Sequence, residues 1–381
     1  MALDYSVRSG NKMLRCGYTT GTCAALAAAG AAVLLLTGRK PEILSLVTPK
    51  GIPVQVEPAE LYIRQDTAIC GVVKDGGDDA DITHGLVIQA HLRKTDRPGI
   101  SIDGGEGVGR VTSPGLDQPV GNAAINRVPR QMITEQVQKV CERLGYNGGI
   151  EVLICIPGGR EAAEKTFNPM LGITGGLSIL GTSGIVEPMS EQALIDTIEV
   201  EIRQAAAVGA KGIILTPGNY GEDFLRQHSE QYGGLDGQIP VVKCSNFIGD
   251  ALDIAALYPF ERVLLVGHIG KLVKLAGGIM NTHSRYADCR TELICAHAAI
   301  CGGSRQLCTD LMRAATTDAC IEILDREQLR QMVLDSLLTA IQSHLSHRVQ
   351  GRFEVGAVLF SNRYGLLGET EAGKEIIKAW N

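Results

Sequence analysis

The sequence predicts an α+β N-terminal domain over residues 1–149, followed by an α/β Rossmann-like domain with a mainly parallel sheet over residues 150–381. The length of 381 residues suits two or three domains of roughly 150 residues each. One strong helical segment near 21–37 is followed by short extended pieces broken by Gly, Pro and Asp. From Ile150 onward, near-continuous apolar strands alternate with glycine-rich loops and helices, which is typical of a parallel sheet covered on both faces.

The first domain opens with an alanine-rich helix. Basic residues before this apolar segment give it the look of a secretory signal peptide. However, Thr20 or Thr22 can cap its start and Gly38 can end it, so we expect a buried helix. The remaining expected elements are strands at 43–47, 54–61, 68–73 and 86–92, a helix at 132–144 and a break at 145–149.

The second domain repeats the order strand, glycine loop, helix. We expect strands at 151–156, 212–215, 241–244, 262–266 and 355–360, and helices near 190–208, 249–257, 288–301 and 326–347. In such sheets, ligands bind beyond the carboxyl ends of the strands. The glycine-rich loops after these strands therefore predict a small-molecule site.

Composition and charge exclude several classes of protein. A hydrophobic share of 45% excludes a disordered chain, and a net charge of -6 argues against a nucleic-acid binder. No apolar run reaches the roughly 18 residues that span a bilayer. The eleven cysteines form no CxxC pair, and the group at 289, 295, 301 and 308 fits no zinc or iron–sulfur spacing. We expect reduced thiols, no protein-bound metal and a cytoplasmic location.

Two glycine motifs suggest nucleotide binding, and we discount both as fingerprints. Residues 103–109 fit the turn of common nucleotide-dependent methyltransferases, but the following Pro114-Gly115 is hostile to the helix that such a turn requires. Residues 267–271 (GHIGK) are too short for a P-loop, which leaves a ligand-binding turn or a plain tight turn. A nicotinamide-dependent reductase is disfavoured because no GxGxxG turn is followed by an acidic residue about 20 positions on.

Three polar clusters are candidate functional sites. Hydroxyls at Thr19, Thr20 and Thr22, with Gly21, surround a helix start and favour an anion site. The loop 76–85 holds three carboxylates and a histidine, which leaves open a metal site, proton transfer or a solvated turn. The segment 281–290 is a third polar cluster.

Long motifs along nearly the whole chain resemble one family, the cobalt-precorrin-5B C-methyltransferases of anaerobic cobalamin biosynthesis. The similar segments include LRCGYTTGTCAA at 14–25, the loop 76–85, AINRVPR at 124–130, KTFNPMLGI at 165–173, GTSGIVEPMS at 181–190, PGNYG at 217–221 and GHIGKL at 267–272. Ala80 stands where we would expect proline.

The resemblance implies S-adenosylmethionine-dependent methylation of C-1 of cobalt-precorrin-5B, a cobalt tetrapyrrole, to give cobalt-precorrin-6A. Cobalt then enters with the substrate. A non-catalytic carrier of corrinoid intermediates is the alternative, and it would need no adenosylmethionine pocket. We expect no nucleic-acid or membrane partner, and leave open a homo-oligomer and transient contacts with other enzymes of the pathway.

The resemblance and the expected sheet topology together suggest roles for particular residues. As acid–base candidates we name His84, Asp79 and His283. For adenosylmethionine we name the glycine loops with Gly158, Gly159, Gly218, Asn219, Tyr220, Gly267 and His268. For the carboxylate-rich substrate we name Thr19, Thr20, Gly21, Thr22, Asp78, Arg127, Arg130 and Arg285.

Overall fold

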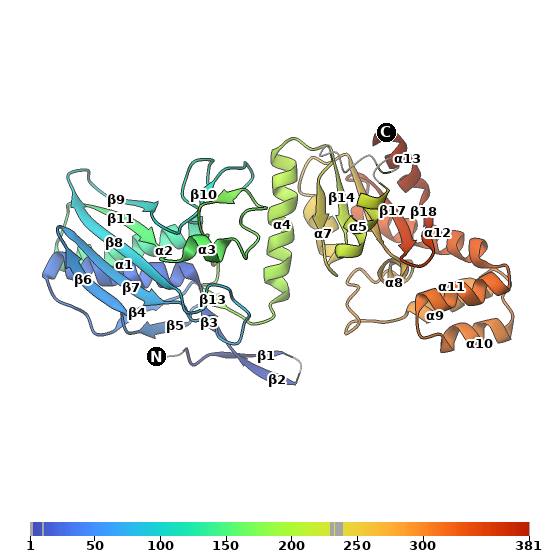
Figure 1. The fold of residues 1–381 in the computed structure, drawn as a ribbon, viewed down its shortest axis with the longest axis horizontal. Helices are drawn as coiled ribbons and strands as arrows, with labels where there is room; N and C mark the ends of the chain where they lie inside the picture. The colour runs from blue at the N-terminus through green and yellow to red at the C-terminus, as the bar shows by residue number, and fades with distance from the viewer. Residues whose placement is uncertain (1–2, 10, 229–231, 233–238, 381) are drawn as a thin grey trace. The chain divides into compact units, whose positions relative to one another are not determined.

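The computed structural model describes residues 3–9, 11–228, 232 and 239–380. The chain divides into two compact units, Met1–Ser190 (unit 1) and Glu191–Asn381 (unit 2), and both are drawn in Figure 1. Each unit mixes helices with a five-stranded sheet, and unit 2 has parallel strands. The coarse prediction of a mixed α/β protein with parallel strands is therefore confirmed.

Unit 1 is built on a mainly antiparallel sheet. Its strand order is β6-β7-β8-β11-β9, in which only the β11–β9 pair is parallel among the described strands. The bounds are Glu60–Arg64 for β6, Thr67–Val73 for β7, Val87–Thr95 for β8, Ile100–Gly104 for β9 and Gly149–Cys155 for β11.

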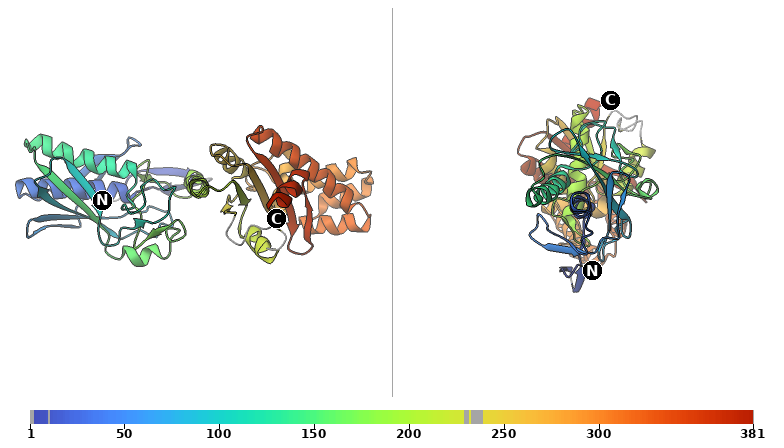
Figure 2. Two further views of the ribbon diagram at one scale, coloured as in Figure 1. Left: turned by 90° about the horizontal axis from the view of Figure 1, so that it is seen from above. Right: turned by 90° about the vertical axis from the view of Figure 1, so that its left-hand side faces the viewer.

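Two helices, α1 (Thr20–Thr37) and α2 (Arg127–Leu144), cover one face of this sheet (Figure 2). The small side chains of α1 let it approach the sheet closely. A Cβ atom on Gly30 would lie 2.8 Å from Cys70 Sγ in β7. Helix α1 is thus a buried core helix, as predicted.

Short strands complete unit 1 around this core. The hairpins are β1 (Ser6–Ser9) with β2 (Lys12–Arg15) and β4 (Leu44–Val47) with β5 (Pro53–Val56). Two-residue strands pair β3 (Gly17–Tyr18) with β13 (Ile185–Val186) and β10 (Arg110–Val111) with β12 (Ile173–Thr174), and α3 spans Gly159–Ala163. The single strand expected at 54–61 is in fact β5 and β6, because Pro58 lies between them.

The expected domain boundary at 149/150 is wrong. Strand β11 begins at Gly149 and lies between β8 and β9, where it pairs with both. It therefore belongs to the sheet of unit 1, and the division between units falls after Ser190. An apolar strand followed by a glycine turn reads alike in either kind of sheet, so its sequence did not reveal its partners.

Unit 2 contains a sheet of order β15-β14-β16-β17-β18, parallel except for β18. The bounds are Gly212–Thr216 for β14, Val241–Lys243 for β15, Arg262–His268 for β16, Glu354–Ser361 for β17 and Gly365–Glu369 for β18. Alternate residues of β16 are buried in different clusters: Val263 and Leu265 on one face, and Leu264 and Val266 on the other. This explains the near-continuous apolar sequence of the strand.

Helices cover both faces of this sheet. Helices α4 (Glu191–Ala207), α7 (Ile248–Ala255) and α12 (Arg330–Val349) pack on one face, and α5 (Asn219–Gln227) and α13 (Glu371–Trp380) pack on the other. After β16 the chain forms α8 (Ile269–Leu272) and a 3-10 turn, Val273–Gly277. Between that turn and α12 come α9 (Arg290–Ile300), α10 (Arg305–Arg313) and α11 (Thr317–Arg326).

Helices α5, α10, α11 and α13 were not predicted. Each has nine or ten residues and a clear amphipathic pattern, which we overlooked in the sequence. A usable signal was the capping residue before two of them. Ser304 accepts a hydrogen bond from the Leu307 amide at 3.1 Å, and Thr316 accepts one from the Ala319 amide at 3.1 Å.

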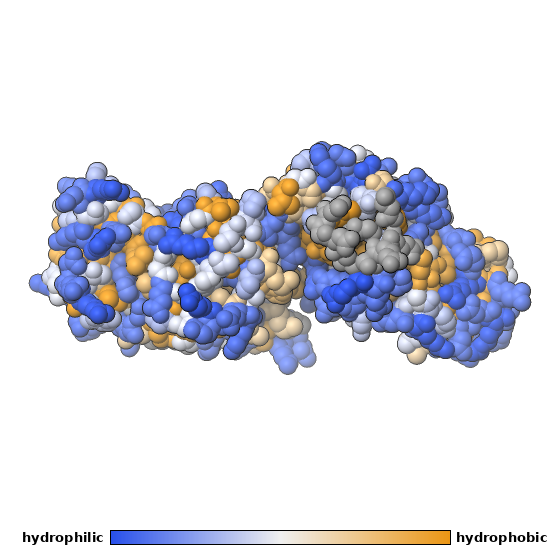
Figure 3. All heavy atoms as spheres, turned by 45° about the horizontal axis from the view of Figure 1, so that its top comes forward, coloured by the Kyte–Doolittle hydropathy of each residue, from blue (hydrophilic) through white to orange (hydrophobic). Residues whose placement is uncertain are grey.

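Within the described residues, α1 is the one helix that is both long and apolar enough to cross a bilayer, and 72% of it is buried inside the protein. Hydrophilic side chains cover most of the face drawn in Figure 3. The burial of α1 is typical of a core helix.

Candidate functional site

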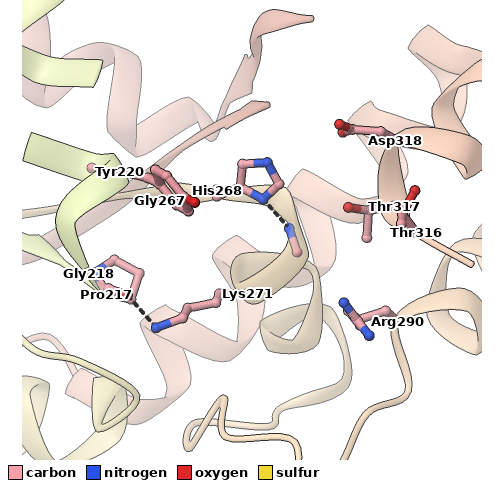
Figure 4. Close-up of a pocket in the computed structure, with 12 residues that line it drawn as sticks. Pro217, Gly218, Tyr220, Gly267, His268, Lys271, Arg290, Thr316, Thr317 and Asp318 are labelled. Carbon is pink, nitrogen blue, oxygen red and sulfur yellow. Dashed lines mark hydrogen bonds between the residues drawn. The ribbon is translucent and has the colours of Figure 1, made fainter. Parts of the chain in front are cut away.

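A pocket of about 410 Å³ opens at the carboxyl ends of β14 and β16 (Figure 4). The chain leaves β14 for α5 on one face of the sheet, whereas β15 leads to α7 on the other, so the strand order reverses between β14 and β16. Open α/β sheets bind ligands at this position. The lining residues are Pro217, Gly218, Tyr220, Gly221, Gly267, His268, Gly270, Lys271, Arg290, Thr316, Thr317 and Asp318.

Two glycine turns form one wall of the pocket. Gly218 has φ 134°, a backbone conformation that favours glycine. A Cβ atom on Gly267 would lie 2.8 Å from Pro217 Cγ and 2.9 Å from Leu272 Cγ. These positions therefore require glycine for backbone conformation and for close packing.

His268 presents a hydrogen-bond donor at the end of β16. Its Nδ1 accepts a hydrogen bond from the Gly270 amide at 3.0 Å, so the neutral ring carries its proton on Nε2. Burial lowers the pKa of His268, which favours that neutral form. The ring lies 6.2 Å from the Tyr220 ring and packs edge-on to Phe360.

Two cations line the pocket, and their surroundings differ. Lys271 Nζ donates hydrogen bonds to the carbonyl oxygens of Pro217 at 2.5 Å and Ser245 at 3.4 Å, and burial lowers its pKa. Arg290 donates from Nε and Nη2 to the Asp288 carboxylate at 2.5 and 3.0 Å. Lys271 thus links the segments that follow β14 and β15, whereas the Arg290 guanidinium is held only along its Nε and Nη2 edge.

The start of α11 forms the opposite wall. Thr317 is 4% exposed, and Asp318 accepts a hydrogen bond from Ser361 Oγ at 2.8 Å. In Figure 4 the side chains of Arg290, Thr317 and Asp318 point toward His268 and Lys271. The pocket therefore combines glycine turns, ring surfaces, a neutral imidazole donor and charges of both signs, which suits a polar molecule that carries both charges.

The sequence identified part of this pocket. The expected cofactor residues Gly218, Tyr220, Gly267 and His268 line it, and Asn219 begins α5 beside it. Gly158 and Gly159, expected at the same site, lie in unit 1 at the start of α3 and do not line it. Sequence reasoning missed the roles of Lys271, Arg290, Thr316, Thr317 and Asp318. The last three lie at the start of α11, a helix that was not predicted, whereas Arg290 begins α9, a predicted helix whose place beside the pocket depends on the tertiary structure.

The acidic loop of unit 1 is tied down by two ion pairs. Asp75 accepts hydrogen bonds from Arg15 Nη1 and Nη2 at 2.5 and 2.9 Å, and these lower the pKa of Asp75. Lys74, 1% exposed, lies with its Nζ 2.6 Å from Asp81 Oδ2. Burial alone would raise the pKa of Asp81, but contacts with Lys74 and Thr83 lower it overall.

The expected catalytic residues of this loop lie at its surface. His84 Nδ1 accepts a hydrogen bond from the Gly76 amide at 3.0 Å, and 57% of its side chain is exposed. Asp79 Oδ1 accepts one from the Met189 amide at 3.3 Å, and Asp78 Oδ2 accepts one from the Arg15 amide at 2.6 Å. Among the described residues, no three His, Cys, Asp or Glu side chains gather as metal ligands.

The helix start at 19–22 is occupied by the protein's own backbone. Thr22 Oγ1 donates to the Gly184 carbonyl at 2.7 Å, and Thr20 Oγ1 accepts from the Leu180 amide at 3.0 Å. Thr19 caps α1, so the expectation that Thr20 or Thr22 would cap it is wrong, and the Gly21 amide donates to the Leu180 carbonyl at 3.1 Å. These contacts give the four residues a structural role, and the anion site expected here finds no support.

The arginines expected to bind the substrate differ in their exposure and in their hydrogen-bond partners. Arg130 donates to the carbonyl oxygens of Ile125 at 2.8 Å and Ile102 at 2.9 Å, and burial lowers its pKa, which indicates a structural role. Exposed Arg127 shares with it a groove of about 300 Å³ in unit 1. Arg285 pairs with Glu191 at 2.7 Å on the surface of unit 2, and its neighbour His283 is also exposed.

Known protein families and relatives match this chain along most of its length. Residues 7–188 match the CbiD family, and residues 281–371 match the CbiD C-terminal domain. A protein of Ruminiclostridium cellulolyticum named cobalt-precorrin-5B C(1)-methyltransferase is 47% identical, over 94% of this chain and 92% of its own. One of Alkaliphilus metalliredigens with the same name is 42% identical over 98% of both chains.

A solved structure is also similar. The crystal structure of the cobalamin biosynthesis protein cbiD from Archaeoglobus fulgidus shares 29% identity, with a TM-score of 0.39, and covers 71% of this chain and 83% of its own. The long, closely similar relatives decide the family. This chain belongs to the CbiD family.

Proposed function

We propose that this protein transfers the methyl group of S-adenosylmethionine to C-1 of cobalt-precorrin-5B, giving cobalt-precorrin-6A in anaerobic cobalamin biosynthesis. The observation that carries the proposal is 47% identity, over 94% of the chain, to a protein named for this reaction. The substrate is a tetrapyrrole, and its cobalt arrives as part of it. All eleven cysteines are free, which supports a reducing, cytoplasmic location.

The methyl donor would bind in the pocket of unit 2. We infer that this unit is a Rossmann-like domain, because parallel strands and helices on both faces bring glycine turns together at a reversal of strand order. The pocket volume falls within the roughly 300–1,000 Å³ of small-molecule sites. Gly218 lets the ligand approach the backbone, Gly267 allows the close packing of the turn, and Tyr220 and His268 offer ring surfaces to an adenine. The residues present therefore fit the donor.

The donor, when bound, supplies a sulfonium methyl group that is already activated for transfer. The chain's own task is then to hold donor and ring carbon close and aligned, which can be worth several kcal/mol. Exposed Arg127 and Arg285 could each bind a substrate carboxylate, and Asp78 is a weaker candidate because it is itself anionic.

Proton transfer is assigned among Asp79, His84 and His283. In both histidines Nδ1 already accepts a backbone amide, from Gly76 at 3.0 Å in His84 and from Arg285 at 3.1 Å in His283. A neutral ring held in this way carries its proton on Nε2 and acts as a donor. Asp79, a carboxylate, is the acceptor among the three.

The test is incubation with cobalt-precorrin-5B and methyl-labelled S-adenosylmethionine, followed by location of the label on the ring. Label at C-1 supports the proposal. Bound corrinoid without transferred label would overturn it in favour of a carrier. Single-turnover rates of Asp79→Asn, His84→Ala and His283→Ala then test the proton roles, with His347→Ala on the exposed surface of α12 as the control. Undiminished rates in all three would remove those roles.

A further inference from the structure

The pocket of unit 2 has an anion-binding corner at the start of α11 that the glycine turns do not explain. Its parts are the outer edge of Arg290, the hydroxyl of Thr317 and the first amides of α11. Each has hydrogen-bonding capacity that no described residue uses.

The first part is the guanidinium of Arg290. Its Nε and Nη2 are held by Asp288, and Nη1 has no partner in the described part of the chain. Figure 4 shows the group directed into the pocket. The ion pair fixes the orientation of the guanidinium while an N–H edge stays available to a ligand.

The second part is the hydroxyl of Thr317. The residue is 4% exposed and lines the pocket, yet its Oγ1 makes no hydrogen bond to any described residue. The oxygen is not among the buried unpartnered atoms of the described residues, so it is open to the pocket. An unpaired hydroxyl that faces the pocket is available to a ligand.

The third part is the N-terminus of α11, a helix of ten residues. The side chain of Thr316 accepts a hydrogen bond from the Ala319 amide, and its carbonyl oxygen accepts one from the Cys320 amide. The amides of Thr317 and Asp318 have no acceptor within the residues described, and they carry the positive end of the helix dipole. They add two donors beside the Thr317 hydroxyl.

A negative charge at the same corner selects the kind of anion. Asp318 uses one carboxylate oxygen on Ser361 and lines the pocket. A phosphate or a plain carboxylate would be repelled by it, whereas the α-amino acid group carries an ammonium beside its carboxylate. The corner is thus complementary to a zwitterion.

We propose that Arg290, Thr317 and the first amides of α11 bind the carboxylate of the methyl donor's amino-acid portion, and that Asp318 binds its ammonium. The proposal rests on the proposed function. It makes Arg290 and Thr317 determinants of donor specificity.

Calorimetric titration with S-adenosylhomocysteine and with 5′-methylthioadenosine, which lacks the amino-acid portion, tests this without any methyl transfer. We expect Arg290→Ala to weaken S-adenosylhomocysteine binding by roughly 10- to 100-fold, as for a lost charge-assisted hydrogen bond. Thr317→Val should weaken it by roughly 2- to 10-fold, and Thr317→Ser should restore it. Methylthioadenosine affinity should change little in any variant. Exposed Arg305→Ala in α10 is the control.

Each other outcome overturns the proposal. Equal weakening of both ligands would mean a general distortion of the pocket, and no weakening would mean that the corner does not bind the donor. Loss of cobalt-precorrin-5B affinity in Arg290→Ala, with donor affinity intact, would assign the corner to a substrate carboxylate. Thr317→Val, which keeps the side-chain shape, tests the proposal even if Arg290→Ala does not fold. If the wild type transfers the label and the variants bind the donor normally, only this inference is refuted. If the wild type transfers no label, the proposed function is refuted.

Discussion

Replacing Lys74 by methionine tests the ion pair that anchors the acidic loop of unit 1. Lys74 is 1% exposed, and its Nζ lies 2.6 Å from Asp81 Oδ2 and 3.3 Å from the Asp75 carbonyl oxygen. Methionine preserves most of the apolar stem and removes the charge. Asp81 then remains largely buried, with only its hydrogen bonds from Thr83.

Breaking a buried pair by removing one partner costs about 3–5 kcal/mol, because the other charge is left uncompensated. The Asp81 side chain keeps 18% exposure and its Thr83 contacts, so we expect the lower end, about 3 kcal/mol. With urea m-values of about 1–3 kcal/mol/M, the unfolding midpoint should fall by roughly 1–3 M. The loop also carries Asp79 and His84, so methyl transfer should fall with it.

Urea unfolding followed by far-UV circular dichroism measures this shift. Lys139→Met, on the exposed surface of α2, is the matched control and should leave the midpoint unchanged. The double variant Lys74→Met with Asp81→Asn should recover part of the loss, because no charge remains unpaired. A midpoint like that of the wild type in Lys74→Met, or no recovery in the double variant, would refute the electrostatic reasoning.

Three further predictions follow from single contacts. Gly218→Ala should lose S-adenosylhomocysteine affinity, because φ 134° is strained for alanine by about 1–3 kcal/mol. The control Gly209→Ala, which has φ 80° and lies outside the pocket, should bind normally. Equal binding of the two variants by calorimetry would contradict this prediction. Thr20→Val should lower the unfolding free energy by about 1–3 kcal/mol in urea melts, because it leaves a buried amide unpaired; an unchanged midpoint would count against the structural role of this hydroxyl. The folded-state pKa of Asp81 is lowered, so its stabilisation exists above the unfolded pKa of about 3.9 and is lost as pH falls through the folded value. Between about pH 6 and about pH 3 the urea midpoint should therefore drop less in Lys74→Met than in the wild type. Parallel curves of midpoint against pH would be evidence against this role of the Lys74–Asp81 pair.

Local sequence predicted the elements whose ends are marked by capping or turn residues. The helix Thr20–Thr37 has a capping threonine before it and Gly38 after it. The strands β14 and β16 are apolar runs that end in glycine turns, and their order along the chain predicted a ligand site at their carboxyl ends. Gly218, Tyr220, Gly267 and His268 were found in this way, because each lies at the carboxyl end of a recognisable strand or within four residues after it.

Tertiary structure decided everything that depends on a distant partner. The sequence of β11 is apolar in the manner of a parallel strand, yet it pairs with β8 and β9 and belongs to unit 1. The threonines at 19–22 looked available to an anion until residues 180–184 covered them. Arg290 and Thr317 reach the pocket from helices far along the chain from Gly218. Period and capping are properties of neighbouring residues, whereas pairing, burial and unused hydrogen bonds arise when segments distant in sequence meet, so only the folded chain reveals them.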